Sequence, residues 1–512
     1  MSRISAAKAL VAWLNSEGAE TAHVQCCAGD DGEMGLHAAT ELKSGAELFR
    51  CPSSVAITAE VASTDVAIGA LRDVDDEHRV LLFLLQQRYL GKDSRWHAYI
   101  DSLPDESALL PRIPAFWPND ERDALLRGTP ICAQARATYA SLCDFHEVVV
   151  TRELVARNPA RFPAEAFSLS RLCWAHAIWS SRAIRLPLPG GPRPSLVPLL
   201  DMMNHSAGLP TTVSHAHPGA TSAGANPLSC ASFVVHAGRA TPKGQELHLN
   251  YGAKGNGELL RDHGFVLADN HADVYELDLS GLCTSRAVVE DRLRLVRGQG
   301  RGSSGSGAAR SFLFRGGGLP PKLLPTARVL CAKDGDELRD AVAAFAAFAI
   351  GSEGGEGSED DEGGKGVCSP NERRGGGGDS HEAGASGGGV VSSAREFDWS
   401  LVDWSADDPF AAANAAVAQE TPCGEVCERK MLVELQRLLR ERATALPQLH
   451  EPRPNDTRAG HERREMAHTY VEGLRKILDD AESEVARGLA ALVPDDHSRP
   501  QGERAPKRVR LC

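Results

Sequence analysis

The sequence has no apolar run long enough to cross a bilayer. A membrane-spanning helix needs about 18–20 consecutive apolar residues, and the longest apolar stretch, around residues 341–350, is too short. A broad basic field is also missing, because 69 acidic residues outnumber 56 basic ones and give a formal net charge of −13. The charge balance therefore disfavours binding to the phosphate backbone of a nucleic acid. We expect a soluble protein that binds neither membrane nor nucleic acid.

Regularly spaced cysteine pairs are lacking as well. The 13 cysteines are scattered along the 512 residues, and the pair Cys423 and Cys427 has no second pair at zinc-binding spacing. We therefore expect no metal site. A chain of this length does not need disulfides to stabilise it, so the scattered thiols indicate a reducing compartment.

Hydrophobic periodicity indicates a β-rich region interrupted by helices. Residues 24–57 carry short apolar groups separated by Gly, Lys-Ser-Gly and Cys-Pro-Ser breaks, which is typical of a β-meander. From about 75 to 186 the apolar residues recur three or four apart, as in amphipathic helices. Strand-like patterns return in SLVPLL, ASFVVHAG and QELHLNYG. The sequence therefore predicts an α+β fold, with a helical insert at about 75–186 in a β-rich domain.

The chain beyond residue 270 reads as largely helical. It is too long for a single hydrophobic core, since cores rarely grow beyond about 250–300 residues, and its last helical patterns are long and amphipathic. Gly, Ser, Asp and Glu dominate residues 298–307 and 351–393, and such segments cannot bury enough apolar surface to fold. We expect an all-α domain over 273–490 with disordered loops at these two places, followed by a flexible basic tail at 491–512.

Three short segments in fixed order carry the strongest functional signal. They are GEMGL at 32–36, LLDMMNHS at 199–206 and ELHLNYG at 246–252, and together they resemble the SET domain. The segments WHAYIDSLP, IWSSRA and NGELLRDHGFVLADN are similar to the Rubisco large-subunit methyltransferase-like branch of that family. The resemblance implies a SET domain over 5–272 and a helical substrate-binding domain after it.

The resemblance also implies a cofactor, S-adenosyl-L-methionine, and a set of site residues. By the match to the late Asn-Tyr-Gly of the family, Tyr251 is the catalytic residue. Asn204 and His205 match the pair that holds the adenine end of the cofactor, with Asp201 beside them, and Arg182 matches the arginine that pairs with its carboxylate. The glycine-rich turn that approaches the methionine portion of the cofactor corresponds to Met34, Gly35 and Leu36. The substrate channel corresponds to Ile184, Leu200 and Tyr251.

The chemistry of methyl transfer fits these residue types. The reaction is an in-line displacement at a sulfonium methyl, so alignment and desolvation supply most of the catalysis and no metal or covalent nucleophile is needed. A lysine must first lose its proton, which costs about 4 kcal/mol near neutral pH. A narrow apolar channel helps because it disfavours the ammonium form. We expect transfer to a lysine of a non-histone protein, since no cysteine cluster follows Tyr251 as in histone-directed SET enzymes.

Two alternatives stay open. In the actin-histidine branch of the family, the position two after the arginine is polar and an aromatic residue precedes the aspartate. Here these positions hold Ile184 and Leu200, which favours lysine over histidine. The second alternative is a catalytically idle SET-like module that binds a partner protein. It draws support from the glycine turn, where Glu33-Met34-Gly35 departs from the usual Gly-x-Gly and Gly32 lies one place too far upstream.

The expected partner is a protein substrate, bound by the C-terminal helical domain of a monomer. Members of this branch act on translation factors, ribosomal proteins and other cytosolic or nuclear proteins, so the plastid is not implied. The basic tail with Lys507, Arg508 and Arg510 is compatible with nuclear import. We therefore favour a cytoplasmic or nuclear location.

Overall fold

The structure is a computed structural model that describes residues 2–282 with short gaps and the remainder of the chain in pieces. The predicted loops at 298–307 and 351–393, and all but the first two residues of the predicted tail, lie outside the described residues. The described residues are 2–29, 33–188, 191–206, 208, 212–216, 232–282, 292, 310–315, 318–320, 323–333, 337–338, 340–342, 425–449 and 457–492.

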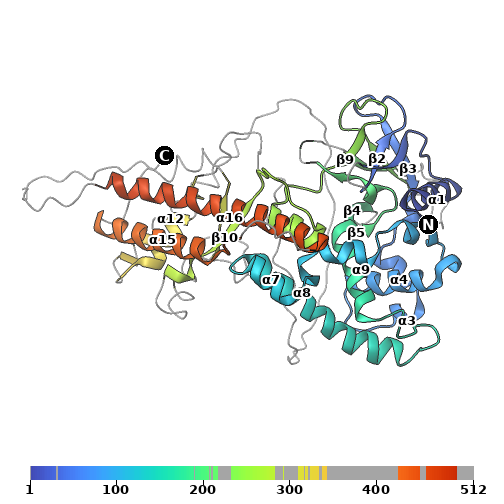
Figure 1. Cartoon of the computed structure of the whole chain (residues 1–512), viewed down its shortest axis with the longest axis horizontal. Helices are drawn as coiled ribbons and strands as arrows, with labels where there is room; N and C mark the ends of the chain where they lie inside the picture. Colours follow the sequence, from blue (N-terminus) through green and yellow to red (C-terminus); the bar gives the residue numbers. More distant parts are fainter. Residues whose placement is uncertain are drawn as a thin grey trace, which may run out of the picture.

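Small sheets form the β-rich part of the molecule (Figure 1). The first has the strand order β1-β2-β9-β6, the second has the order β3-β8-β7, and β4 pairs with β5. All these pairings are antiparallel except that β6 runs parallel to β9. The strands are β1 (Val24–Ala28), β2 (Met34–Ala38), β3 (Glu47–Pro52), β4 (Ala183–Leu188), β5 (Gly191–Leu196), β6 (Asn204–His205), β7 (Thr212–Ala216), β8 (Ser232–His236) and β9 (Glu246–Leu249).

The sequence pattern explains the strands that surround the site. β8 is rich in aromatic and β-branched residues, which suit a pleated surface, and its central Phe233, Val234 and Val235 are all buried. In β2, Leu36 and Ala38 are fully buried while His37 between them is partly exposed, as the two-residue period of a strand requires. These buried faces fix the register that brings β2 against β9.

Helices fill the segment between β3 and β4, as predicted. α4 begins after Asp75, whose carboxylate accepts a hydrogen bond from the main-chain N–H of His78 at 2.9 Å, a typical N-cap. The middle of α4 is wholly buried, and it packs against α9, which ends at Arg182. The helices are α1 (Arg3–Ser16) before the sheets, then α2 (Ala59–Ser63), α3 (Val66–Gly69), α4 (Asp76–Leu90), α5 (His97–Ser102), α6 (Glu106–Leu109), α7 (Asn119–Leu126), α8 (Pro130–Phe145), the π-helix η5 (His146–Val155) and α9 (Leu169–Arg182).

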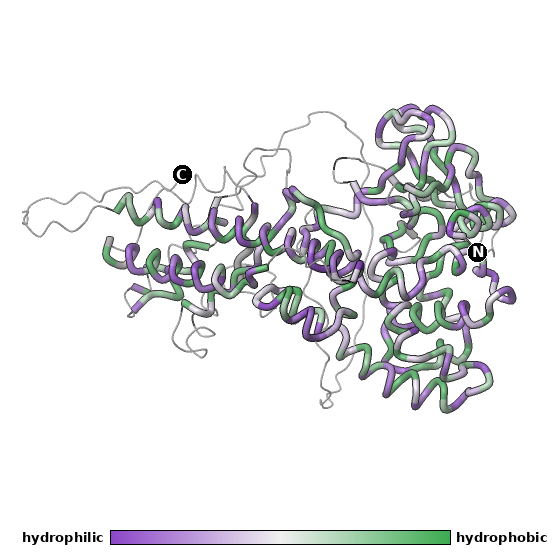
Figure 2. The backbone as a smooth tube through the Cα atoms, in the orientation of Figure 1, coloured by the Kyte–Doolittle hydropathy of each residue, from purple (hydrophilic) through white to green (hydrophobic). Residues whose placement is uncertain are grey.

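The C-terminal region extends away from the sheets as a pair of long helices, α15 (Glu425–Ala445) and α16 (Arg458–Ala491), with α12 (Leu323–Cys331) beside them (Figure 1). The 34 residues of α16 make it about 50 Å long. Apolar and polar residues alternate along both helices (Figure 2), because one face of each is buried against the other. Among the described residues, no helix combines the length and apolarity of a membrane span.

A two-stranded sheet precedes these helices, and the helical pattern did not indicate it. β10 (Val274–Asp278) pairs antiparallel with β11 (Arg310–Phe314). The signal was present in β10, where Tyr275 and Leu277 are buried while their neighbours are more exposed. Five residues with this alternation are typical of a half-buried strand.

The described residues form two hydrophobic cores. The first contains the sheets, α1, α4 and α9. The second lies between α12, α15 and α16. It also includes Trp117, Leu125 and Leu126 from the helical insert and Leu260 from the end of the predicted SET domain. By sequence order these residues belong to the first domain, but they pack in the interior of the second.

Candidate active site

The predicted catalytic tyrosine lies beside the Asn-His motif. The parallel pairing of β6 with β9 sets His205 opposite Leu249, two residues before Tyr251. The main-chain N–H of Tyr251 donates to Nδ1 of His205 at 3.2 Å, and the two ring centroids are 5.1 Å apart. The structure therefore brings together two motifs that lie 46 residues apart in the chain.

The phenol of Tyr251 is held by main chain. Its hydroxyl donates to the carbonyl oxygen of Met203 at 2.8 Å. Burial raises the pKa of Tyr251 to about 12, with Asp201 and Glu246 adding to this and Arg182 opposing it. The side chain is therefore a neutral phenol near pH 7, so it cannot act as a general base. Its oxygen still offers lone pairs to a weak donor.

Arg182 and Asp201 meet at the end of α9. Nη1 of Arg182 donates to the main-chain oxygen of Asp201 at 2.9 Å and lies 3.5 Å from its carboxylate Oδ2. That Oδ2 also accepts from the hydroxyl of Tyr99 at 2.8 Å. Burial raises the pKa of Asp201, while Arg182 and Tyr99 oppose the rise. Tyr99 lies in the quoted WHAYIDSLP segment, but its role was not predicted, because only the fold brings α5 against Asp201.

Two groups in this cluster have unused hydrogen-bonding capacity. Oδ1 of Asp201 is buried and has no partner among the described residues. Nε and Nη2 of Arg182 likewise have no partner within the part of the chain that the structure describes. A buried polar atom without a partner costs about 1–3 kcal/mol. A ligand donor at Oδ1 would relieve this cost for Asp201, and a ligand acceptor could bind the remaining N–H groups of Arg182, whose side chain is 21% exposed.

The predicted glycine turn forms a close backbone approach. A Cβ at Gly35 would collide with the carboxylate of Glu246 and lie 3.2 Å from Nδ2 of Asn204. Asn204 in turn donates to Oε1 of Glu246 at 2.7 Å. The missing side chain at Gly35 therefore leaves room for β2, β6 and β9 to converge. Of the neighbouring positions, Leu36 is fully buried and Met34 nearly so.

The predicted channel residues lie in the first core. Leu200 is fully buried in the 3₁₀-helix η6 (Leu200–Met202), and Ile184 of β4 packs against the same core. η6 begins after Leu199, which has φ 73°. A non-glycine residue in this left-handed region is uncommon and strained. The strain falls directly before the segment that carries Asp201, Asn204 and His205.

His263 also lies against Tyr251, although no sequence pattern predicted a role for it. The two rings stack with centroids 4.8 Å apart. His263 ends the π-helix η7 (Leu259–His263), which follows the short helix α10 (Asn256–Glu258). A π-helical turn is frequent at functional sites, but it leaves no clear mark in a single sequence.

Comparisons with known proteins find N-methyltransferases among the proteins similar to this chain. No family model matches the chain. It is 26% identical over 324 residues to the chloroplastic ribulose-1,5-bisphosphate carboxylase/oxygenase large subunit N-methyltransferase of Pisum sativum. This alignment covers 62% of each chain. It is 25% identical over 344 residues to the actin-histidine N-methyltransferase of Gallus gallus, covering 65% of this chain and 53% of the relative. The chain thus spans between about half and two thirds of these relatives.

Solved structures give the same result for the fold. The SET domain of LSMT bound to lysine and AdoHcy matches with a TM-score of 0.65 and 19% identity, over 95% of this chain and 92% of the other. Rubisco LSMT bound to AdoMet matches with a TM-score of 0.62 and 18% identity. The chain is therefore similar to the SET-domain methyltransferases of the Rubisco LSMT-like branch. It has their α+β fold with a large helical C-terminal region.

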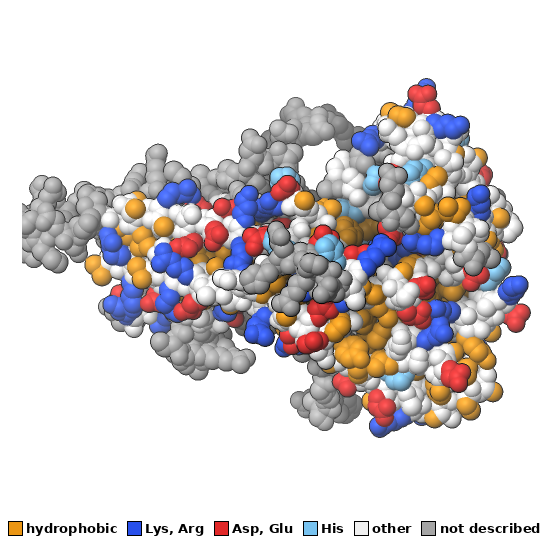
Figure 3. Space-filling view, in the orientation of Figure 1, with side chains coloured by type: hydrophobic (Ala, Val, Ile, Leu, Met, Phe, Trp, Pro, Cys, Tyr) orange, Lys and Arg blue, Asp and Glu red, His pale blue; other side chains and the backbone are white. Residues whose placement is uncertain are grey.

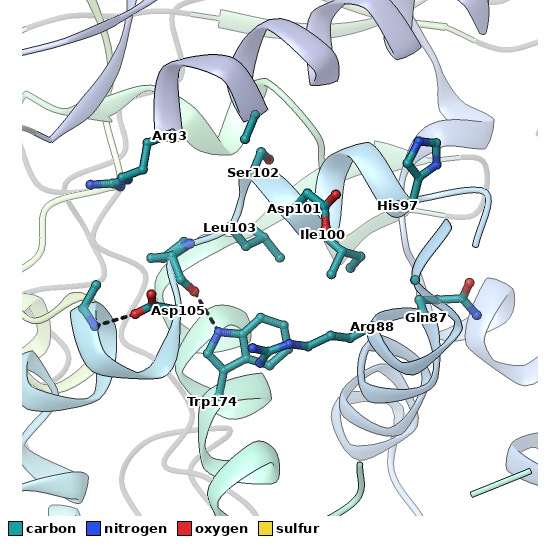
Figure 4. A pocket seen from close by; sticks show the side chains of 14 residues that line it. Arg3, Gln87, Arg88, His97, Ile100, Asp101, Ser102, Leu103, Asp105 and Trp174 are labelled. Atoms are coloured by element: carbon teal, nitrogen blue, oxygen red, sulfur yellow. Dashed lines mark hydrogen bonds between the residues drawn. The ribbon is translucent and has the colours of Figure 1, made fainter. Parts of the chain in front are cut away.

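A separate cavity of about 300 Å³ lies between α1, α4, α5 and α9 of this SET-type fold (Figure 4). The guanidinium of Arg88 lies 4.0 Å from the ring centroid of Trp174, and it donates to both carboxylate oxygens of Glu106 at 2.9 and 3.0 Å. The indole of Trp174 donates to the carbonyl of Pro104 at 2.8 Å (Figure 4). These groups therefore already have partners, and none of the predicted SET-site residues lines the cavity.

Metal ligands do not gather in the described part of this SET-type fold. Within those residues, no group of three or more His, Cys, Asp or Glu side chains could hold a metal ion. The side chains of Cys423 and Cys427 lie outside the described residues.

Proposed function

We propose that the chain is an S-adenosyl-L-methionine-dependent protein methyltransferase that modifies a lysine side chain of a non-histone protein. The observation that carries this proposal is the setting of Tyr251, a neutral phenol tied to the Met203 carbonyl and packed against His205. Such a phenol can orient an amine and accept weak C–H···O contacts. It supplies neither a base nor a nucleophile, which is what a displacement at an already activated methyl requires.

The cofactor side of the site fits S-adenosylmethionine, which supplies an electrophilic methyl on a sulfonium. Its methionine portion carries a carboxylate and an ammonium group. The unused N–H groups of Arg182 suit the carboxylate, because a guanidinium binds carboxylates through paired donors. The unpartnered Oδ1 of Asp201 is an acceptor for an N–H donor. At Gly35 the side chains of Glu246 and Asn204 occupy the space that a Cβ would need, so a larger residue there would disturb the strands that carry the Asn-His motif.

The acceptor side supports an uncharged nitrogen nucleophile. Ile184 and Leu200 contribute apolar surface to the core against which Tyr251 packs. Apolar surroundings disfavour the ammonium form of a lysine. An N-methyltransferase of the Rubisco large subunit and an actin-histidine N-methyltransferase match at similar identity, so histidine is the second candidate acceptor. The apolar residues at 184 and 200 favour lysine.

We also propose that the protein substrate contacts the C-terminal helices. Val426 and Val433 of α15 are exposed by 66% and 48%. Seven residues apart on a helix, they share one face. Lys, Arg, Asp and Glu side chains are intermixed over α15 and α16 (Figure 3). The surface of these helices therefore carries no strong charge of one sign that would repel a protein partner. An apolar pair within a mixed charged surface suits a protein better than a phosphate backbone.

The proposal is tested by incubating the purified protein with tritiated S-adenosylmethionine and a cell extract. We expect a labelled protein band with the wild-type chain and labelling about 100-fold slower with Tyr251→Phe. Mass spectrometry of the labelled band identifies the modified residue. A methylated histidine would show that histidine, and not lysine, is the methyl acceptor. Absence of cofactor affinity in calorimetry would favour an idle binding module instead.

The surface proposal has its own test. Val433→Glu should lower labelling of the protein substrate about tenfold, because it places a charge within an apolar contact. The matched control is Val148→Glu on η5, an equally exposed valine (51%) remote from α15 in the chain. Cofactor affinity should be unchanged in both variants. Equal labelling by the two variants would contradict this use of α15.

A further inference from the structure

The ring of His263 is held from three sides. It stacks on Tyr251 with an interplanar angle of 29°. Its Nδ1 lies 3.0 Å from the main-chain oxygen of Ser181, next to Arg182 at the end of α9. Its Nε2 lies 3.2 Å from Nζ of Lys254. The imidazole therefore joins the phenol, the end of α9 and a lysine.

These contacts determine the tautomer of His263. The oxygen of Ser181 can only accept a hydrogen bond, so Nδ1 must carry the proton. Nε2 is then a lone-pair acceptor, and the ammonium of Lys254 donates to it. Protonation of Nε2 would remove this hydrogen bond and bring two cations into contact. The geometry thus favours a neutral imidazole beside a charged lysine.

The charged groups around the pair agree with this assignment. Burial, with smaller contributions from Lys254 and His205, lowers the pKa of His263 to about 4, although Asp262 and the Ser181 carbonyl oppose the shift. Arg261 is bound to Asp262 through two hydrogen bonds of 2.7 and 2.6 Å, which leaves less of that negative charge for His263. The charge of Lys254 also acts to lower the pKa of Glu258 in α10 and the pKa of His205.

We propose that His263 and Lys254 are positioning residues for methyl transfer: the imidazole holds the plane of the Tyr251 ring, and the lysine keeps a positive charge beside that imidazole, one ring away from Tyr251. A like charge nearby favours the uncharged form of an incoming amine. The pair therefore assists the proton loss that must precede transfer. This inference rests on the proposed function and adds a determinant of its pH dependence.

The lysine is tested by the pH dependence of tritium transfer to extract proteins between roughly pH 6 and pH 10. Lys254→Met should move the rise of the rate to higher pH by about one unit, because the like charge is removed. Lys254→Arg restores the charge and should restore the profile. Calorimetric affinity for S-adenosylmethionine should stay within about twofold, because the ammonium of Lys254 is bound to His263 and not to Arg182, Asp201 or Asn204. An unchanged profile in Lys254→Met overturns the role of the lysine.

The histidine is tested by a matched pair of substitutions. His263→Ala removes the ring and should lower the rate about tenfold at every pH, since the phenol loses its support. His263→Phe keeps an aromatic ring against Tyr251 and should recover most of the rate. Equal losses in the two variants overturn the positioning role.

A measurement without turnover separates this inference from the proposed function. Nitrogen-15 NMR of labelled protein reports the tautomer of His263, with His263→Phe to assign its signal. A proton on Nδ1 supports the inference, and a proton on Nε2 overturns it, whether or not the chain transfers a methyl group. A wild-type chain that binds no cofactor would instead refute the proposed function.

Discussion

The hydroxyl of Tyr251 donates to the main-chain oxygen of Met203, at 2.8 Å. Main chain cannot rotate away as a side chain can, so the phenol oxygen is fixed just ahead of Asn204 and His205. Because the hydroxyl proton is committed to this bond, the lone pairs of the oxygen are what it offers to a ligand. This single bond therefore couples the Asn-His motif to the Tyr motif.

Tyr251→Phe removes this bond and the acceptor together. We expect the rate of methyl transfer to fall by about 100-fold, in the range found when one preorganised polar group is lost. The free energy of unfolding should fall by only about 1 kcal/mol, the net worth of one hydrogen bond. Tritium transfer and urea denaturation measure the two effects. Retained activity would show that the phenol oxygen takes no part in the reaction.

Gly35→Ala tests the close approach of β2 to β9. The new methyl group would collide with Glu246 and crowd Asn204, so we expect at least a tenfold loss of cofactor affinity in calorimetry. Gly208→Ala is the matched control, since a Cβ there meets no atom within 4 Å. Equal affinities for the two variants would separate the glycine turn from cofactor binding.

Tyr99→Phe tests the support of Asp201. The substitution leaves the buried carboxylate without its hydroxyl donor, so the free energy of unfolding should fall by about 1–3 kcal/mol. Tyr89→Phe, at an exposed tyrosine (48%), should change it by less than about 0.5 kcal/mol. Urea denaturation of both variants gives the comparison. If the two tyrosines proved equivalent, Tyr99 would contribute nothing to the stability of the site.

His263 should make stability depend on pH. Burial lowers its pKa from the ordinary 6.5 to about 4 in the folded chain, so the unfolded chain binds the proton more tightly. Its contribution is fully present above about pH 6.5 and is lost as the pH falls toward 4, by at most about 3 kcal/mol. His263→Gln removes this loss.

The comparison with His263→Gln is needed because Asp273 acts in the opposite direction. Burial raises the pKa of Asp273 to about 6, so its contribution grows as the pH falls through the same window. Asp273 is present in both proteins and cancels in the difference between them. We therefore expect wild type to lose stability relative to the variant between pH 6.5 and pH 4 in urea denaturation. A constant difference would contradict the shifted pKa.

The sequence predicted the parts of the fold that depend on periodicity and short motifs. The strands around Leu36 and Leu247, the helices α4 and α16, and the joining of the Asn-His and Tyr motifs all follow from local pattern or from the family resemblance. Arg182 and Asp201 were both predicted as cofactor-binding residues, but the contact that the structure shows between them was not predicted.

Tertiary contacts account for what the sequence could not predict. Tyr99 looks like an ordinary buried helix residue until α5 is packed against Asp201. His263 lies 12 residues after Tyr251, and only the return of η7 stacks the two rings. The strand β10 is short, and its partner β11 lies more than 30 residues further on, so no hairpin turn marks the pair.

The packing of α7 limits how the chain can be divided. Trp117, Leu125 and Leu126 precede Tyr251 in the chain but have their apolar neighbours among the C-terminal helices. A fragment that stopped at the predicted boundary of 272 would expose these side chains to water, and a fragment that began there would have a hole in its interior. Cutting between the two units therefore damages both, and the chain should melt in one cooperative transition.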